Sequence, residues 1–234
     1  MSHLESGFCV TDIEALALTV KDQCPDLELV RQNKYRTWAT DHGRLAGDYP
    51  LPGIYQLKLM AVLKRAGHDV HALAAEQGVK LPANLLDLEK QSWTQEMQYK
   101  LFKNKIIKAA YDKLSAEVIG NDAEFVIRYK DRTKHKDAYE VGVVPHPTRK
   151  GEYMMMCDFY CNGMGLLDAK GMGKHKRVAG KDTWGGELKQ AYATRAAERA
   201  IIGQIQAGNP EYGSYTKTVL PDGRIKIEVQ PRSI

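Results

Sequence analysis

Three runs of alternating apolar and polar residues follow one another between residues 124 and 160, with no helical pattern between them. In the first run, Phe125, Ile127 and Tyr129 alternate with charged residues, and the period continues over 139–143 and 153–159. A side-chain period of two is typical of strands that turn one face toward a core. Consecutive strands without intervening helices favour an antiparallel sheet with its helices on one face.

Helices and further strands are predicted on both sides of this region. The spacing of Thr11 and Glu14 is that of a capping box, with the Thr11 hydroxyl as the cap of a helix that ends at Cys24, before a proline. The other expected elements are strands at 5–10 and 27–30, a helix at 186–206, and a hairpin with strands at 215–220 and 225–229.

Residues 36–120 carry helical patterns and divide the strand-forming regions. The expected helices are 54–66, closed by Gly67, then 69–77, capped by Asp69 and closed by Gly78, a short helix opened by Pro82, and a longer one over 94–118. We therefore predict an α+β core of residues 1–35 and 121–234 and a helical insert subdomain of residues 36–120. The fold class is α+β: an antiparallel sheet with helices packed on one face, plus the insert.

The same periodicity predicts one common core. Its expected members are Leu16, Phe125, Ile127, Val141, Val143, Met155, Phe159, Ile201, Ile225 and Ile227.

Composition favours an ordinary folded protein. Hydrophobic residues make up 43% of the 234 residues and charged residues 27%, so disorder is not expected. There is no run of roughly 18 apolar residues and no secretory pattern at the start, and we expect a cytoplasmic location. The net charge of +5 neither requires nor excludes a nucleic-acid partner.

Two motifs resemble metal and nucleotide sites without completing them. Cys157 and Cys161 lack a second ligand pair of the usual zinc spacing, and Cys157 falls on a strand, where a buried apolar role is expected. The glycines before Lys174 suggest a phosphate loop, but Asp168 and His175 replace the glycine and the hydroxyl residue that the motif requires. We expect no cofactor, no zinc and no ATP binding.

A helix-turn-helix and an acid–base site are equally incomplete. Ala74 and Gly78 have the spacing of a helix-turn-helix, but Asn84 stands where its second helix needs an apolar residue, so an ordinary helical hairpin is favoured. Asp158, Asp168 and His175 are close only in sequence, and catalytic groups are defined by geometry. No catalytic residue is assigned.

A basic loop at residues 170–181 is the candidate binding site. It contains three glycines and no acidic residue, and its expected contacts to nucleic acid or an acidic partner are Lys170, Lys174, His175, Lys176, Arg177 and Lys181. A second basic run, residues 128–136, lies at a strand turn and would extend the same face.

Several short motifs outside the insert resemble those of the hypothetical chloroplast open reading frame thirty-five family, a domain of unknown function found in plastids, cyanobacteria, other bacteria and some phages. The matching positions are Met1-Ser2-His3, Asp12 to Leu16, Phe125-Val126-Ile127, Tyr139-Glu140-Val141-Gly142, Gly151-Glu152-Tyr153, Asp158, Tyr192 and Asp222-Gly223. The resemblance implies no catalytic residues. It does imply a partner, because similar proteins are often encoded beside an AAA-type ATPase.

The sequence thus leaves two hypotheses open. The first is a non-enzymatic adaptor or regulatory binding protein that acts with a protein partner such as an AAA-type ATPase. The second is a nucleic-acid-binding protein that uses the basic loop.

Overall fold

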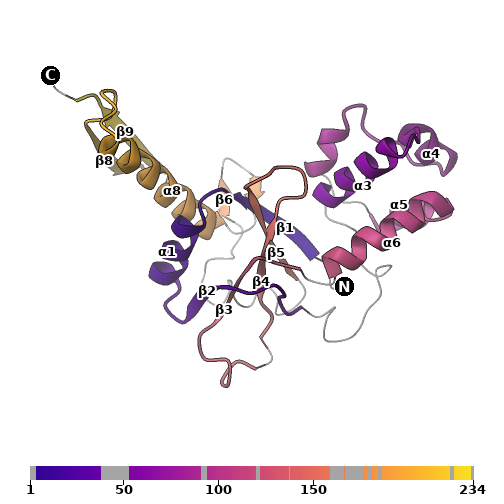
Figure 1. The fold of residues 1–234 in the computed structure, drawn as a ribbon, viewed down its shortest axis with the longest axis horizontal. Helices are drawn as coiled ribbons and strands as arrows, with labels where there is room; N and C mark the ends of the chain where they lie inside the picture. The colour runs from indigo at the N-terminus through magenta and orange to yellow at the C-terminus, as the bar shows by residue number, and fades with distance from the viewer. Residues whose placement is uncertain are drawn as a thin grey trace.

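A five-stranded antiparallel sheet forms the centre of the computed structural model (Figure 1). The structure describes residues 4–37, 53–90, 94–119, 122–136, 138–158, 166, 176–178, 181–183, 186–221 and 224–232. The strand order is β1-β5-β4-β3-β2, with bounds β1 Leu4–Val10, β2 Leu27–Arg31, β3 Phe125–Tyr129, β4 Val141–Pro145 and β5 Tyr153–Asp158. Every neighbouring pair is antiparallel, so the predicted α+β class is confirmed.

Helices α1 (Ile13–Gln23) and α8 (Gly186–Gln206) cover one face of this sheet (Figure 1). Their apolar stripes meet alternate residues of the central strands. The buried side chains of this cluster include Leu16, Val20, Ile127, Val141, Val143, Met155, Cys157, Leu188 and Tyr192. Burying each large apolar side chain contributes about 1.5–3 kcal/mol, so this face is a genuine core.

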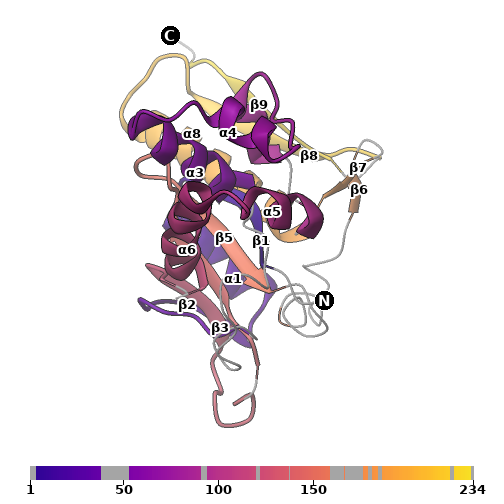
Figure 2. The same ribbon diagram turned by 90° about the vertical axis from the view of Figure 1, so that its right-hand side faces the viewer.

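The helical insert covers the opposite face, and the molecule has three layers (Figures 1 and 2). Its elements are α3 Gly53–Arg65, α4 Val70–Glu76, the 3₁₀ helix η2 Leu85–Lys90, α5 Gln95–Leu101 and α6 Lys105–Ile119. Leu59, Ile107 and Tyr111 of the insert belong to one buried cluster with Val126 and Met156 of the sheet. The sheet is therefore buried on both sides.

Local chemistry sets the ends of the short insert helices as expected. The Asp69 carboxylate accepts hydrogen bonds from the amides of His71 and Ala72, at 3.0 and 3.1 Å, and caps α4. Gly67 and Gly78 adopt φ angles of 86° and 68°, in the left-handed region that closes a helix without strain only in glycine.

Two predicted helix starts are wrong. Asp12, not Thr11, caps α1, since its carboxylate accepts the Ala15 amide at 2.9 Å. The helix expected from Pro82 is instead the 3₁₀ helix η2, which begins at Leu85.

The single long helix expected over 94–118 is also wrong, because the chain forms two helices there. The Asn104 side chain accepts from the amides of Ile106 and Ile107 and starts α6 anew after α5 has ended. Asparagine competes for backbone groups in this way, which favours helix caps over helix interiors.

The common core is confirmed for five of its expected members and incomplete for others. Leu16, Ile127, Val141, Val143 and Met155 are buried together, with Phe125 packed against them. Phe159 lies outside the described residues. Ile225 and Ile227 were predicted wrongly: they lie in a separate two-stranded sheet and are half-buried.

Two small antiparallel hairpins stand apart from the main sheet. One pairs β6 Lys176–Val178 with β7 Lys181–Thr183. The other pairs β8 Ser214–Val219 with β9 Ile225–Gln230 and follows α8.

Candidate protein-binding arm

The C-terminal end of α8 and the β8–β9 hairpin project from the body of the molecule, and we call residues 200–232 the arm (Figure 1). Helix α8 is 21 residues long, and its first half packs on α1. Gly208, with a φ of 78°, ends the helix, and Asn209 donates to the Gln204 carbonyl at 3.1 Å. The chain then returns along α8 as the hairpin.

The hairpin has one polar and one largely apolar face. The pairs Thr216–Glu228 and Thr218–Lys226 lie on the polar face. The other face contains Tyr215, Lys217, Val219, Ile225, Ile227 and Val229. Because the Lys217 ammonium pairs with Glu198 of α8 at 3.0 Å, this second face is the one that turns toward the helix.

Helix α8 leaves part of the apolar face uncovered. Val219 is 68% exposed, Val229 is 37% exposed, and Ile202 of the helix is 40% exposed. Among the described strands, β8 and β9 pair only with each other, so each has an edge that lacks a partner strand. A two-stranded hairpin is marginally stable by itself, and open edges are sites at which other chains add.

The base of the arm is fixed by Tyr192 of α8. Its hydroxyl oxygen accepts from the amides of Thr11 and Asp12, at 2.7 and 3.1 Å. The ring packs on Phe8 with the centroids 5.5 Å apart. These contacts satisfy two amides at the start of α1 and hold α8 against it.

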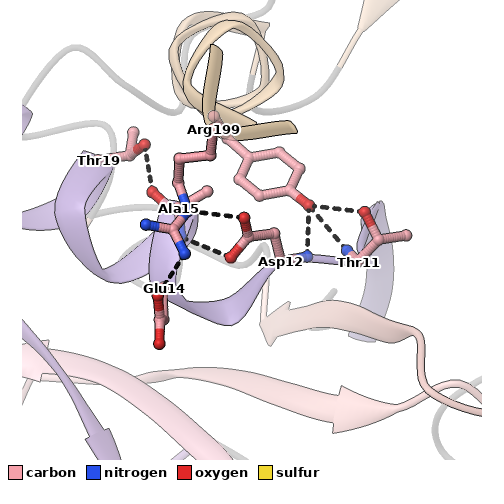
Figure 3. Close-up of polar contacts among 7 residues, drawn as sticks. Thr11, Asp12, Glu14, Ala15, Thr19 and Arg199 are labelled. Atoms are coloured by element: carbon pink, nitrogen blue, oxygen red, sulfur yellow. Dashed lines mark hydrogen bonds and ion pairs between the residues drawn. The ribbon is translucent and has the colours of Figure 1, made fainter. Parts of the chain in front are cut away.

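Three ion pairs extend this attachment along the helices. Arg199 reaches from α8 to the carboxylates of Asp12, at 2.8 Å, and Glu14 (Figure 3). One turn earlier, Arg195 pairs with Asp22 at 2.5 Å. Arg199 stands where α8 leaves the body, so these pairs set the direction in which the arm projects.

Opposing effects act on the pKa of the Asp12 carboxyl group. Burial raises its pKa, but the Ala15 amide and the Arg199 guanidinium outweigh burial and hold the pKa below its usual range. Hydrogen bonds to Asp12 and Glu14 raise the pKa of Arg199 in turn. A depressed carboxyl pKa adds stability above the unfolded pKa, and that stability is lost as the pH falls through the folded pKa.

Asp12→Asn should therefore destabilise the protein at neutral pH and not in acid. Asparagine caps a helix about as well as aspartate, so the substitution removes mainly the charge. We expect a loss of up to about 1 kcal/mol at pH 7, because the pair is partly exposed. As the pH falls below about 4 and on through the lowered pKa of the folded Asp12 carboxyl, the wild-type chain loses this stability and the two melting temperatures should converge. A difference that is constant across a pH series of thermal melts would contradict the ion-pair account.

The basic loop expected from the sequence lies largely outside the described residues. Lys170, Lys174 and His175 fall there, while Lys176 and Arg177 lie in β6 and Lys181 lies in β7. In the hairpin register Arg177 is opposite Asp182. Nucleic-acid binding through residues 170–181 stays a prediction.

The described residues assemble none of the other motifs. They hold no group of three or more histidine, cysteine, aspartate or glutamate side chains close enough for a metal ion. Cys157 is buried in the core, as expected of a small apolar residue, while Cys161, Asp168 and the glycines before Lys174 lie outside the described part. Helix α4 is followed by η2, so the helix-turn-helix lacks an α-helix to enter a DNA groove. None of the described helices has the length and apolar character needed to cross a bilayer.

The sequence reasoning missed the arm as a site. It identified the hairpin correctly but assigned Ile225 and Ile227 to the main core. One feature of the sequence could have indicated the arm. The apolar alternation continues to Val219 and Val229 on a hairpin that follows a 21-residue helix.

Comparison of the chain with protein-family models, with curated proteins and with solved structures gave no match. The resemblance to the chloroplast reading-frame family therefore stays a prediction.

Proposed function

We propose that the protein is a non-catalytic adaptor that binds a protein partner through the arm. The observation that carries the proposal is the exposure of Val219 and Val229, on the apolar face of the projecting hairpin, and of Ile202 on α8. Exposed apolar surface bordered by polar residues is typical of protein interaction sites.

The open strand edges favour a particular mode of binding. An extended segment of a partner can add to β8 or β9, so that main-chain hydrogen bonds give affinity and side-chain contacts give specificity. The Asp12–Arg199 pair and the Tyr192 hydroxyl hold the arm in place beforehand, which lowers the ordering cost of binding. An AAA-type ATPase is the first candidate partner, because the family that the sequence resembles is often encoded beside one.

Val219→Lys should weaken partner binding by about thirtyfold or more, whereas Thr218→Lys should preserve it. Both residues are exposed neighbours on β8 and both substitutions add one positive charge, but only Val219 lies on the apolar face. Desolvating a lysine at the centre of an interface is expected to cost at least about 2 kcal/mol, or about thirtyfold in affinity.

The measurement is site-specific photo-crosslinking in the native cell from position 219 and from position 218, read out by mass spectrometry. The proposal predicts that one foreign protein dominates the crosslinks from position 219 and is absent from those at position 218. In a titration, Val219→Lys should weaken the binding of that protein relative to the purified wild-type chain. Crosslinks only to a second copy of this chain, or equal crosslinking from both positions, would show that the arm is not an adaptor surface.

A further inference from the structure

The loop between β3 and β4, residues 130–140, projects from the sheet at the end of the molecule away from the arm (Figures 1 and 2). It and the end of β3 concentrate positive charge. Residues 128–137 include five basic side chains and two acidic side chains, Asp131 and Asp137; the basic ones are Arg128, Lys130, Arg132, Lys134 and Lys136. Residues 130–134 and 136 are all exposed.

Two acidic side chains near this loop, Asp131 and Glu140, accept hydrogen bonds from backbone amides. Asp131 accepts from the amides of Thr133 and Lys134, at 3.1 and 3.0 Å, and so shapes the turn. Glu140 is only 5% exposed and accepts from the Arg36 amide at 2.9 Å. Glu140 is thereby withdrawn from the surface, whereas Asp131, which is exposed, keeps its negative charge on the loop.

Contacts with neighbouring segments also hold the loop in place. The His135 ring stacks on the Tyr129 ring, with the centroids 3.8 Å apart and the planes 13° from parallel. The Arg36 guanidinium donates to the Lys136 carbonyl, and the Lys130 ammonium donates to the Pro25 carbonyl at 2.6 Å. The backbone that presents the lysines is thereby held in one shape.

Two lysines remain available for a ligand. Within the described residues, the side chains of Lys134 and Lys136 are exposed, and their ammonium groups take part in none of the hydrogen bonds or ion pairs described above. Beside them lies a shallow hollow lined by Arg128, Tyr129, Arg132, His135, Lys136, Ala138, Tyr139 and Glu140. Cations beside aromatic rings are the combination that binds nucleic-acid phosphates and bases.

We propose that the β3–β4 loop binds nucleic acid through the phosphate backbone, with Lys134 and Lys136 as the main phosphate contacts. Arg132 lies on the rim of the hollow, where its guanidinium pairs with Glu140 at 3.7 Å. Membrane binding is disfavoured, because residues 130–136 contain no aliphatic or aromatic side chain at the exposed tip that could enter a bilayer. The site is distinct from the arm and does not depend on the adaptor function.

The test is a fluorescence anisotropy titration of the full chain with labelled single-stranded DNA, and with a duplex of the same sequence, over a series of salt concentrations. Lys134→Gln/Lys136→Gln should weaken binding about 25-fold at 0.1 M salt, because two phosphate contacts lower the salt slope by about 1.4. The matched control is Lys103→Gln/Lys105→Gln, which removes the same charge from two exposed positions of the insert and should change affinity less than about twofold.

A third variant moves the affinity in the opposite direction. Asp131→Asn keeps an oxygen that can accept from the Thr133 and Lys134 amides but removes the negative charge, so it should tighten binding. The proposal is overturned if both double variants lose affinity equally, if wild-type binding does not depend on salt, or if the chain binds phosphatidylserine vesicles and neither form of DNA. Loss of DNA binding by Val219→Lys would equally contradict the separation of the two sites.

Discussion

Gly142→Ala is expected to destabilise the protein by about 1–3 kcal/mol although it adds only one methyl group. Gly142 is the second residue of β4 and is paired with Val126 on one side and Met156 on the other. A methyl group at this position would stand 2.5 Å from two ring carbons of Tyr35. That ring is 3% exposed and packed into the insert-side core, so it cannot move aside without disturbing its neighbours.

Two comparisons separate this clash from a general effect of alanine. Gly203→Ala, in α8, adds the same methyl group where no atom lies within 4 Å, and it should stabilise the chain by about 0.5–1 kcal/mol. In a Tyr35→Ala background, Gly142→Ala should cost little, since the clashing ring is gone. Urea unfolding of the wild-type chain and the four variants measures both effects. If Gly142→Ala lowered the free energy of unfolding equally in the presence and in the absence of the Tyr35 ring, the strain would not come from the contact with this ring.

The central sheet could be predicted from the sequence because its alternation is local and regular. Its second buried face was harder to see. Strand β4 reads Val-Gly-Val-Val and β5 contains Met154, Met155 and Met156, so both sets of alternate positions are apolar. Strands buried on both faces read as continuous apolar runs. The pattern therefore indicated a cover for each face, and the insert provides the second one.

Helix starts could not be predicted where a distant contact decides them. Thr11 and Asp12 both offer a capping oxygen. The Tyr192 hydroxyl, about 180 residues later in the chain, contacts the Thr11 hydroxyl at 3.3 Å and accepts hydrogen bonds from the amides of Thr11 and Asp12. The Asp12 carboxylate is then left to cap the helix and to pair with Arg199. A capping motif weighs only neighbours in the sequence, whereas this choice depends on how α8 packs.

For the candidate sites, too, one part could be predicted from the sequence and another part depends on the fold. Charge density in residues 128–136 is visible in the sequence, but which acids neutralise it is not. The hydrogen bond from the Thr133 amide to the Asp131 carboxylate depends on the loop conformation. The burial of Glu140 depends also on Arg36, which comes from another segment and donates its amide to the Glu140 carboxylate. The exposure of Val219 likewise depends on where α8 ends relative to the hairpin, and the apolar periodicity of the sequence does not contain this information.

Leu59→Ala should destabilise the sheet as much as the insert that contains it. Leu59 of α3 is fully buried in the cluster that joins the insert to Val126 and Met156, and its truncation is expected to cost about 2–5 kcal/mol. Because one core spans both parts, hydrogen exchange under mild denaturant should show equal losses of protection free energy in α6 and in β3 and β4. Leu86→Ala is the control: this leucine of η2 is 62% exposed, and its loss should cost within about 0.5 kcal/mol. If Leu59→Ala lowered protection only within residues 53–119, the insert would be an independent subdomain, and the two-sided core would not act as one cooperative unit.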